Sequence, residues 1–148
     1  MLAIGSDHRG YPLKEEIKKY LEELQVSYKD FGTDSEERVD SLPIIDKVCK
    51  SIQNQECDRG ILICGTGLAM CITSNKYKGI MCALCQEGLS AARSREHNNS
   101  NLLAMGAEVV EVGKAKEIVK IWLETEFLGG KYAERVEQIK ELENKNMK

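Results

Sequence analysis

The stretch from Arg59 to Lys76, with the sequence RGILICGTGLAMCITSNK, constrains the fold more than any other part of the chain. It starts with a short apolar run that ends at Cys64, followed by Gly65-Thr66-Gly67 and a segment able to form a helix. α/β proteins place their ligands on such a unit of buried strand, small-residue turn and helix start. The turn offers backbone N–H groups to an anion, and it carries a thiol at the carboxyl end of the strand.

Short apolar runs alternate with segments of helical periodicity along the rest of the chain. The predicted strands cover residues 1–6, 26–31, 61–64, 80–85 and 102–105, and residues 109–112 are predicted to be a short extended piece. The predicted helices cover residues 12–24, 43–52, 68–76, 87–95, 114–127 and 132–144. This alternation predicts an α/β fold in which helices cover both faces of a five-stranded, mostly parallel sheet.

The length of 148 residues suits one compact domain over residues 1–148, and no shift of composition marks a linker. The last predicted helix, over residues 132–144, stands apart after Gly129-Gly130. Its apolar stripe could pack on its own subunit or on a neighbouring one. We therefore expect a homo-oligomer.

Charge and composition exclude several partners. The formal net charge is −3 with both signs interspersed, which argues against a nucleic-acid surface. No apolar run approaches the length of a membrane span, and charged residues come too early for a signal peptide, so we expect a cytoplasmic protein without membrane contact. The six cysteines are then expected to be free thiols. Cys82 and Cys85 form a C-x-x-C pair, but no second pair completes a zinc site, so no metal is expected.

Ligands of a parallel sheet bind at the carboxyl ends of its strands. Residues with functional side chains gather near these ends: Asp7 and His8 after the first strand, Asp40 after the second and Cys64 to Gly67 after the third. We also place His97 and Asn98, which come just before the fifth strand, at this edge. The only two histidines of the chain are therefore expected beside Cys64.

Cys64 itself has three interpretations at this point: an inert core residue, a nucleophile or a base. The N-terminus of a helix favours the thiolate, which suits both reactive roles. A hydrolase would need a histidine beside the nucleophile and a carboxylate to orient it. The chain has neither a Walker loop nor a G-x-G-x-x-G motif, so a nucleotide is not indicated, and a small anion or an enediolate suits the short turn better.

Several short motifs then occur in a characteristic order: Gly5-Ser6-Asp7-His8 with Gly10, Asp30-Phe31-Gly32-Thr33, Val39-Asp40, Glu56-Cys57-Asp58-Arg59-Gly60, Ile63-Cys64-Gly65-Thr66-Gly67, Ser74-Asn75-Lys76, Ser94-Arg95-Glu96-His97-Asn98, and Gly129-Gly130 with Arg135-Val136. With these motifs the chain resembles ribose-5-phosphate isomerase B, in the ribose/galactose isomerase family that also includes the galactose-6-phosphate isomerase subunits. The resemblance covers most of the chain, and the order and spacing of the set make it specific.

The resemblance implies a three-layer Rossmann-like fold, a homodimer or homotetramer with active sites between subunits, and an aldose–ketose isomerase that uses neither metal nor cofactor. It implies that Cys64 is the base that moves a proton between C1 and C2 of a sugar phosphate through a cis-enediolate. The other implied catalytic roles are oxygen binding by Thr66 with the N–H groups of Gly65 and Gly67, proton transfer among substrate oxygens by Asp7, and furanose ring opening by His97 from a neighbouring subunit. Further substrate contacts are expected at His8, Asn98, Arg135, Lys131, Ser41 and Arg9.

The chain departs from the family's pattern where the substrate is bound. Ser41-Leu42 replaces Tyr-Pro, Gly106-Ala107-Glu108 replaces Gly-Glu-Arg, and Gly129-Gly130-Lys131-Tyr132 replaces Gly-Gly-Arg-His. A carboxylate at Glu108 would repel a phosphate, whereas Arg9 could supply a replacement cation. Three functions therefore stay open: isomerisation of ribose 5-phosphate, the same reaction on another sugar or sugar phosphate such as a hexose 6-phosphate, and a catalytically weak sugar-phosphate-binding protein.

Overall fold

The computed structural model describes residues 1–147, so Lys148, the last residue of the predicted domain, lies outside the described residues. Within the described chain five strands form one sheet in the order β2-β1-β3-β5-β4. The strands are β1 (Leu2–Ser6), β2 (Tyr28–Asp30), β3 (Arg59–Cys64), β4 (Cys82–Leu84) and β5 (Leu102–Gly106), and all neighbouring pairs are parallel. The helices are α1 (Tyr11–Glu23), α2 (Leu42–Gln53), α3 (Leu68–Ser74), α4 (Gly88–Glu96), α5 (Val112–Glu124) and α6 (Lys131–Asn146).

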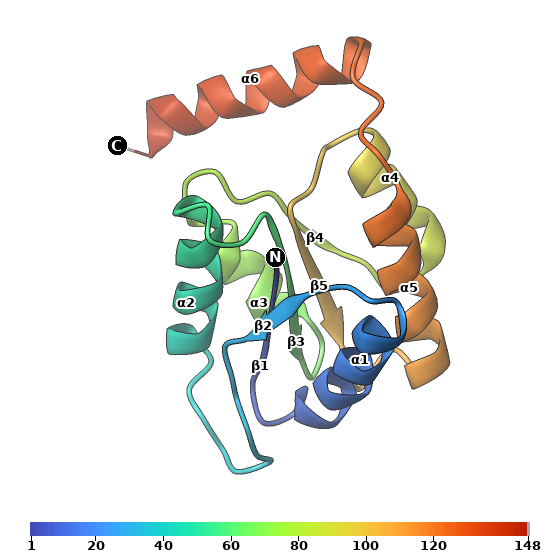
Figure 1. Ribbon diagram of the computed structural model, residues 1–148. Helices are drawn as coiled ribbons and strands as arrows, with labels where there is room; N and C mark the ends of the chain where they lie inside the picture. The colour runs from blue at the N-terminus through green and yellow to red at the C-terminus, as the bar shows by residue number, and fades with distance from the viewer. Residues whose placement is uncertain (148) are drawn as a thin grey trace.

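The sheet is the middle of three layers, as predicted (Figure 1). In β3, Gly60 to Cys64 are all buried, which explains why this stretch of the sequence contains no charged residue. Ile61 and Ile63 face a core cluster that includes residues of α1 and α5, and Leu62 and Cys64 face a second cluster that includes residues of α2 and Met70 of α3. The α/β class and the parallel sheet are confirmed, and the sheet is parallel throughout.

Three segments differ from the prediction. β2 covers only Tyr28–Asp30 of the predicted 26–31, at one edge of the sheet. β4 covers only Cys82–Leu84 of the predicted 80–85, at the edge of the sheet where it has one neighbour, β5. Residues 109–112 do not form a strand: the N–H groups of Val109 and Val110 both donate to the carbonyl oxygen of Gly106, at 3.1 and 2.9 Å, and α5 begins at Val112. The β-branched residues of this segment suggested a strand, but a turn closes directly after β5 instead.

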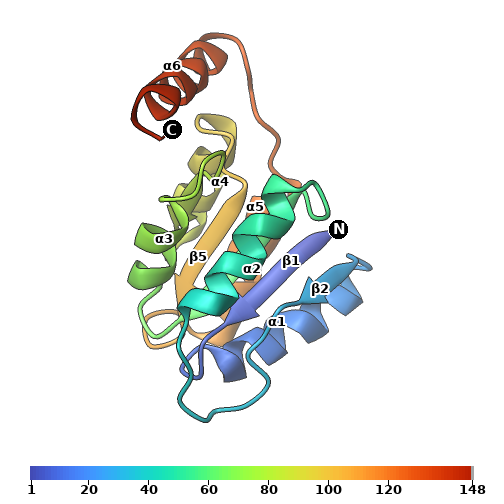
Figure 2. The same cartoon turned by 90° about the vertical axis from the view of Figure 1, so that its left-hand side faces the viewer.

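α6 lies apart from the sheet layers, and the strands point away from it (Figures 1 and 2). Among its described residues only Val136 is buried, while Leu142 is 60% exposed. Two contacts tie this part of the chain to the amino edge of the sheet: the Leu128 N–H donates to the Glu96 carbonyl at 3.1 Å, and the Gly79 N–H donates to Glu143 Oε2 at 2.9 Å. Along the apolar stripe of α6, Val136 is therefore covered by the chain itself and Leu142 remains exposed.

A buried cation ties α1 to β2. The side chain of Lys14 is fully buried, and its Nζ donates to Oδ1 and Oδ2 of Asp30 at 2.7 and 2.8 Å and also to the Thr33 carbonyl. Lys18 Nζ lies 2.9 Å from Asp30 Oδ2. Burial alone would raise the pKa of the Asp30 carboxyl, but hydrogen bonds from Lys14, the Gly32 N–H and Lys18 outweigh burial and lower that pKa below its ordinary value of 3.8.

Asp30→Asn is expected to lower the free energy of unfolding by about 3 kcal/mol at pH 7, because the buried ammonium of Lys14 loses its counter-charge. The folded-state pKa of Asp30 lies below the unfolded one, so its contribution is complete above the ordinary carboxyl range and is lost as the pH falls through the folded pKa. Urea unfolding at pH 7 and at pH 3 measures both effects. The exposed pair of Lys19 and Glu16 supplies the control, since Glu16→Gln should change stability by less than about 0.5 kcal/mol. An Asp30→Asn protein as stable as the wild type would contradict this account.

Candidate active site

Cys64 is the last residue of β3, and its thiol faces the turn that follows. The Gly67 N–H donates to Cys64 Sγ at 3.1 Å, and the Cys64 side chain is almost buried, with 6% of the residue exposed. The Gly67 N–H, which was predicted to hold a substrate oxygen, therefore contacts the thiol sulfur in this structure.

Thr66 is the exposed residue at the tip of the same turn. Its Oγ1 accepts a hydrogen bond from the Leu68 N–H at 3.3 Å, which leaves the hydroxyl hydrogen free to be donated outward. Thr66 and Cys64 thus present a donor and a thiol at one end of β3, next to the start of the short helix α3.

Close packing against β5 explains why the turn is rich in glycine. Gly67 has a φ of +82°, in the left-handed region, and a Cβ there would lie 2.9 Å from the carbonyl carbon of Met105. A Cβ on Gly106 would come within 2.5 Å of the backbone of Thr66. The turn therefore rests directly on the carboxyl end of β5, and this contact fixes the position of Cys64.

Asp7 and His8, which follow β1, lie at the same edge as Cys64. Asp7 Oδ1 accepts hydrogen bonds from the N–H groups of Arg9 and Gly10, both at 3.0 Å, and so holds the loop that leads into α1. His8 Nδ1 accepts from the Val39 N–H at 3.3 Å, which draws the loop after β2 toward β1. Both side chains thus have a structural contact besides the predicted substrate role.

Arg9, which was predicted to supply a replacement cation, forms an ion pair with a carboxylate. Its Nη1 lies 3.3 Å from Oε1 of Glu108, in the turn that follows β5. The expected replacement cation therefore lies against Glu108, one of the residues that depart from the family's pattern.

Ser41 lies at the N-cap of α2, where its side chain makes no capping hydrogen bond. The neighbouring Asp40 accepts a hydrogen bond from the Leu42 N–H at Oδ1, at 3.1 Å, and so organises the start of the helix instead. A hollow of about 480 Å³ lies beside this loop, and Asp40 and Val39 are among its lining residues. Ser41 is half-buried near the Cys64 end of the sheet.

His97 and Asn98 lie at the opposite edge of the sheet, so their predicted position beside Cys64 is wrong for a single chain. His97 is the C-cap of α4 and precedes β5, whose first residue Leu102 pairs with Gly60, while Gly106 at its other end pairs with Cys64. A residue just before a parallel strand lies at the amino edge, and the length of β5 alone separates the two edges by about 13 Å. The prediction treated the two ends of a strand as one edge.

A second group of predicted residues gathers around His97. Its imidazole stacks on the ring of Tyr132, with ring centroids 4.2 Å apart and an angle of 11° between the planes. His97, Asn98, Lys131, Tyr132, Glu134 and Arg135 line a hollow of about 510 Å³ between the end of α4 and the start of α6. This stacking could not be predicted from the sequence, because His97 and Tyr132 come from distant parts of the chain and no local pattern links them.

The chain thus carries two half-sites. We call Asp7, His8, Cys64, Gly65, Thr66 and Gly67 the Cys64 half-site, and His97, Asn98, Lys131, Tyr132 and Arg135 the His97 half-site. Each contains polar groups that are exposed or half-buried, and the sheet separates one half-site from the other within a chain.

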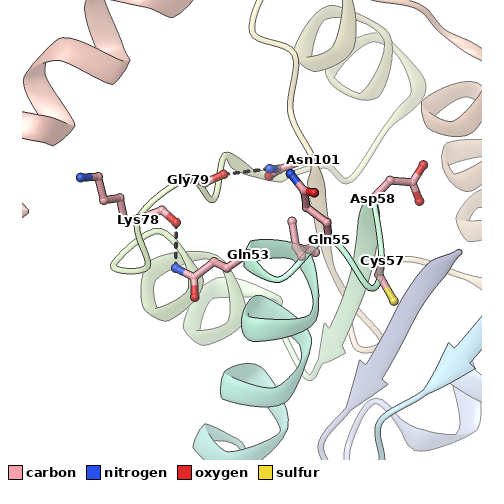
Figure 3. Close-up of a pocket in the computed structure, with 8 residues that line it drawn as sticks. Gln53, Gln55, Cys57, Asp58, Lys78, Gly79 and Asn101 are labelled. Carbon is pink, nitrogen blue, oxygen red and sulfur yellow. Dashed lines mark hydrogen bonds between the residues drawn. The ribbon is translucent and has the colours of Figure 1, made fainter.

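A further hollow of about 710 Å³ at the amino edge contains none of these residues (Figure 3). The side chains of Gln53 and Asn101 point to the backbone there: Gln53 Nε2 donates to the Lys78 carbonyl at 2.8 Å, and Asn101 Nδ2 donates to the Gly79 carbonyl at 2.9 Å (Figure 3). These amides hold the turn before β4 in place. We therefore interpret this hollow as structural.

The described residues contain neither an evident metal site nor a helix that could span a membrane. Within residues 1–147 no group of three or more His, Cys, Asp or Glu side chains is arranged to hold a metal ion. The helices described here are all too short or too polar to cross a membrane. The six cysteines, all within the described chain, are free thiols.

Comparisons with known proteins identify the family. A model described as Ribose/Galactose Isomerase matches residues 2–139. The provisionally named sugar phosphate isomerase YwlF of Bacillus subtilis (strain 168) is 48% identical over 147 residues, 99% of each chain. Ribose-5-phosphate isomerase B of Escherichia coli (strain K12) is 43% identical over 144 residues, 97% of each chain. A solved structure of ribose-5-phosphate isomerase B from Clostridium thermocellum superposes with a TM-score of 0.95 at 47% identity, over 97% of each chain. With these two half-sites on the matching fold, the chain belongs to the ribose/galactose isomerase family.

Proposed function

We propose that this protein interconverts ribose 5-phosphate and ribulose 5-phosphate, as an aldose–ketose isomerase without metal or cofactor. The observation that carries the proposal is the thiol of Cys64 at the end of β3, with the Gly67 N–H at 3.1 Å and the Thr66 hydroxyl beside it. The identity of 43% with ribose-5-phosphate isomerase B over nearly the full chain supports this choice of substrate.

The reaction moves two protons, one from carbon to carbon and one from oxygen to oxygen. Cys64, as the thiolate, takes the proton from C2 of the open-chain aldose, which forms a cis-enediolate, and then returns the proton to C1. The proton of the C2 hydroxyl passes to the oxygen on C1, a transfer that we assign to Asp7. Thr66 donates its hydroxyl hydrogen to the developing oxyanion, and loss of one such donor typically costs about 3–4 kcal/mol of transition-state stabilisation.

A complete site requires two subunits in this proposal. The Cys64 half-site and the His97 half-site lie at opposite edges of one chain, so His97 can reach a substrate on Cys64 only from a neighbouring copy. Leu68 and Ile72, one turn apart on α3 beside the catalytic turn, are 51% and 62% exposed and suit such a contact. In a two-fold dimer, the Cys64 half-site of each subunit would meet the His97 half-site of the other, which makes two complete sites. In this dimer, His97 opens the furanose ring, while Arg135, Lys131 and Asn98 of that neighbouring copy bind the far end of the substrate together with Arg9 beside Cys64.

The location that fits this reaction is the cytoplasm, where sugar phosphates and reduced thiols occur together. We assign residues 1–148 to one sugar-phosphate isomerase domain. The free thiols and the charge pattern agree with both assignments.

A substrate panel tests the proposal. We expect the purified protein to convert ribose 5-phosphate with a higher kcat/KM than it converts free ribose, a tetrose phosphate or a hexose 6-phosphate. A clear preference for one of the other sugars would identify that sugar as the substrate, and the proposed mechanism would still apply. Binding of sugar phosphates with no exchange of the C2 proton in deuterated water would instead support a binding protein.

A second substrate remains a candidate because of Glu108 and Tyr132. Glu108 brings a carboxylate next to the catalytic turn, and the ring of Tyr132 lies against His97. Glu108 adds negative charge beside the catalytic turn, and the ring of Tyr132 takes up space beside His97. The same chemistry on another sugar phosphate is the function that these two residues favour.

A further inference from the structure

The side chains of Arg9 and Glu108 lie against the turn that follows Cys64, next to Gly65. A Cβ on Gly65, the residue after Cys64, would lie 3.2 Å from Cδ of Arg9 and 3.2 Å from Cδ of Glu108. The backbone of Glu108 is fixed to the same turn, since its N–H donates to the Gly65 carbonyl at 2.9 Å. The carboxylate is therefore held next to the residue that joins Cys64 to Thr66.

The surroundings of this pair are acidic. The pair borders a hollow of about 540 Å³, and Arg9 is the only basic residue among those that line it in the described chain. Three carboxylates line the same hollow, from Glu16, Glu108 and Glu111. An anion that approaches Arg9 therefore meets a guanidinium that is already paired and a local excess of negative charge.

The ion pair between Arg9 and Glu108 can be broken at little cost in free energy. The side chains of Arg9 and Glu108 are 62% and 55% exposed, and an exposed pair of this kind contributes little to stability. A phosphate carries more charge than a carboxylate and matches the two-pronged geometry of a guanidinium. A phosphorylated ligand can thus displace Glu108 from Arg9, but it must compete with a carboxylate whose backbone is fixed beside the turn.

We propose that Glu108 is a specificity-determining residue: its carboxylate competes with the phosphate of the substrate for Arg9 and so weakens binding of phosphorylated sugars relative to uncharged ones. The proposal rests on the proposed function for the statement that a sugar phosphate is the ligand. It concerns binding only, so it can be judged without turnover.

The test uses inorganic phosphate as the probe and isothermal titration calorimetry on the intact protein. Glu108→Gln keeps the size of the side chain and removes its charge. We expect it to tighten phosphate binding about three- to tenfold, the range of a partly exposed charge interaction. Arg9→Gln should weaken phosphate binding, and the gain from Glu108→Gln should be largely lost in the Arg9→Gln background. The KM for ribose 5-phosphate should fall with Glu108→Gln while the affinity for uncharged ribose stays the same.

Glu111→Gln is the matched control, because it removes the same charge from the same hollow without touching Arg9 in the described structure. Glu108→Ala serves as a second variant if Glu108→Gln unfolds at a lower temperature than the wild type. Equal phosphate affinity in the wild type and in Glu108→Gln would overturn the proposal, as would an equal gain in Glu111→Gln or no phosphate binding in any variant. Tighter phosphate binding in a protein that isomerises no sugar would support this inference while refuting the proposed function.

Discussion

Cys64→Ala is expected to lower kcat for the proposed substrate by about 10³-fold or more, since a positioned acid–base group contributes about 10²–10⁴-fold and the oxyanion contacts cannot replace it. The fold should survive the change. Cys64 packs among buried residues such as Leu62 and Met70, and the variant loses one sulfur atom, for which a cost of about 1 kcal/mol is expected. The rate of ketose formation and the thermal melting curve measure the two effects separately.

Cys71→Ala is the matched control for this substitution. Cys71 lies on α3, its thiol donates to the Cys82 carbonyl at 3.7 Å, and it belongs to neither half-site. Its loss should change kcat by less than about twofold, as expected for a change away from the reacting atoms. Full activity in Cys64→Ala would refute the proposed role of this thiol as the base.

Alkylation of the protein cannot replace this mutation. A hydrogen bond with Cys82 and others from the Leu84 backbone and Asn75 lower the pKa of Cys71 to about 7, although burial opposes them. Cys71 is also only half-buried, so an alkylating reagent would modify it near neutral pH. Loss of activity on alkylation can be assigned to Cys64 only in the Cys71→Ala background.

The fold was predictable because its three central strands, β1, β3 and β5, are buried on both faces. Each such strand leaves an apolar run in the sequence, as in residues 61–64, and the helices between them keep their 3.6-residue period. Strand ends were less clear. β4 has one neighbouring strand and ends early, and the β-branched residues after β5 form a turn. Local residue preference does not determine such places, since hydrogen bonds to neighbouring segments decide them.

The Cys64 half-site was predictable for a related reason: Asp7 and His8 follow one buried strand, Cys64 ends another, and parallel strands all end at one edge. His97 precedes a strand, so the same rule, applied to its direction, places it at the other edge. The pairing of Arg9 with Glu108 and the stacking of His97 on Tyr132 are contacts between distant segments. No spacing in the sequence encodes them.

Mixing two inactive variants should restore activity. Cys64→Ala destroys every Cys64 half-site and His97→Ala destroys every His97 half-site, so each protein alone is expected to be nearly inactive. In a hybrid two-fold dimer, one site combines the two intact halves and the other combines the two altered ones. Random exchange of equal amounts makes half of the dimers hybrid, so about one quarter of all sites, and about one quarter of wild-type activity, should return.

A second mixture of variants is the control for this experiment. Cys64→Ala mixed with a Cys64→Ala, His97→Ala double variant can form hybrids, but no arrangement of these subunits contains an intact Cys64, so no activity should return. Native mass spectrometry counts the hybrids in both mixtures. If the first mixture forms hybrids and stays inactive, His97 does not act across a subunit boundary. The separation of the two half-sites by the full length of β5 would then require another explanation, because one rigid chain cannot bring His97 to Cys64.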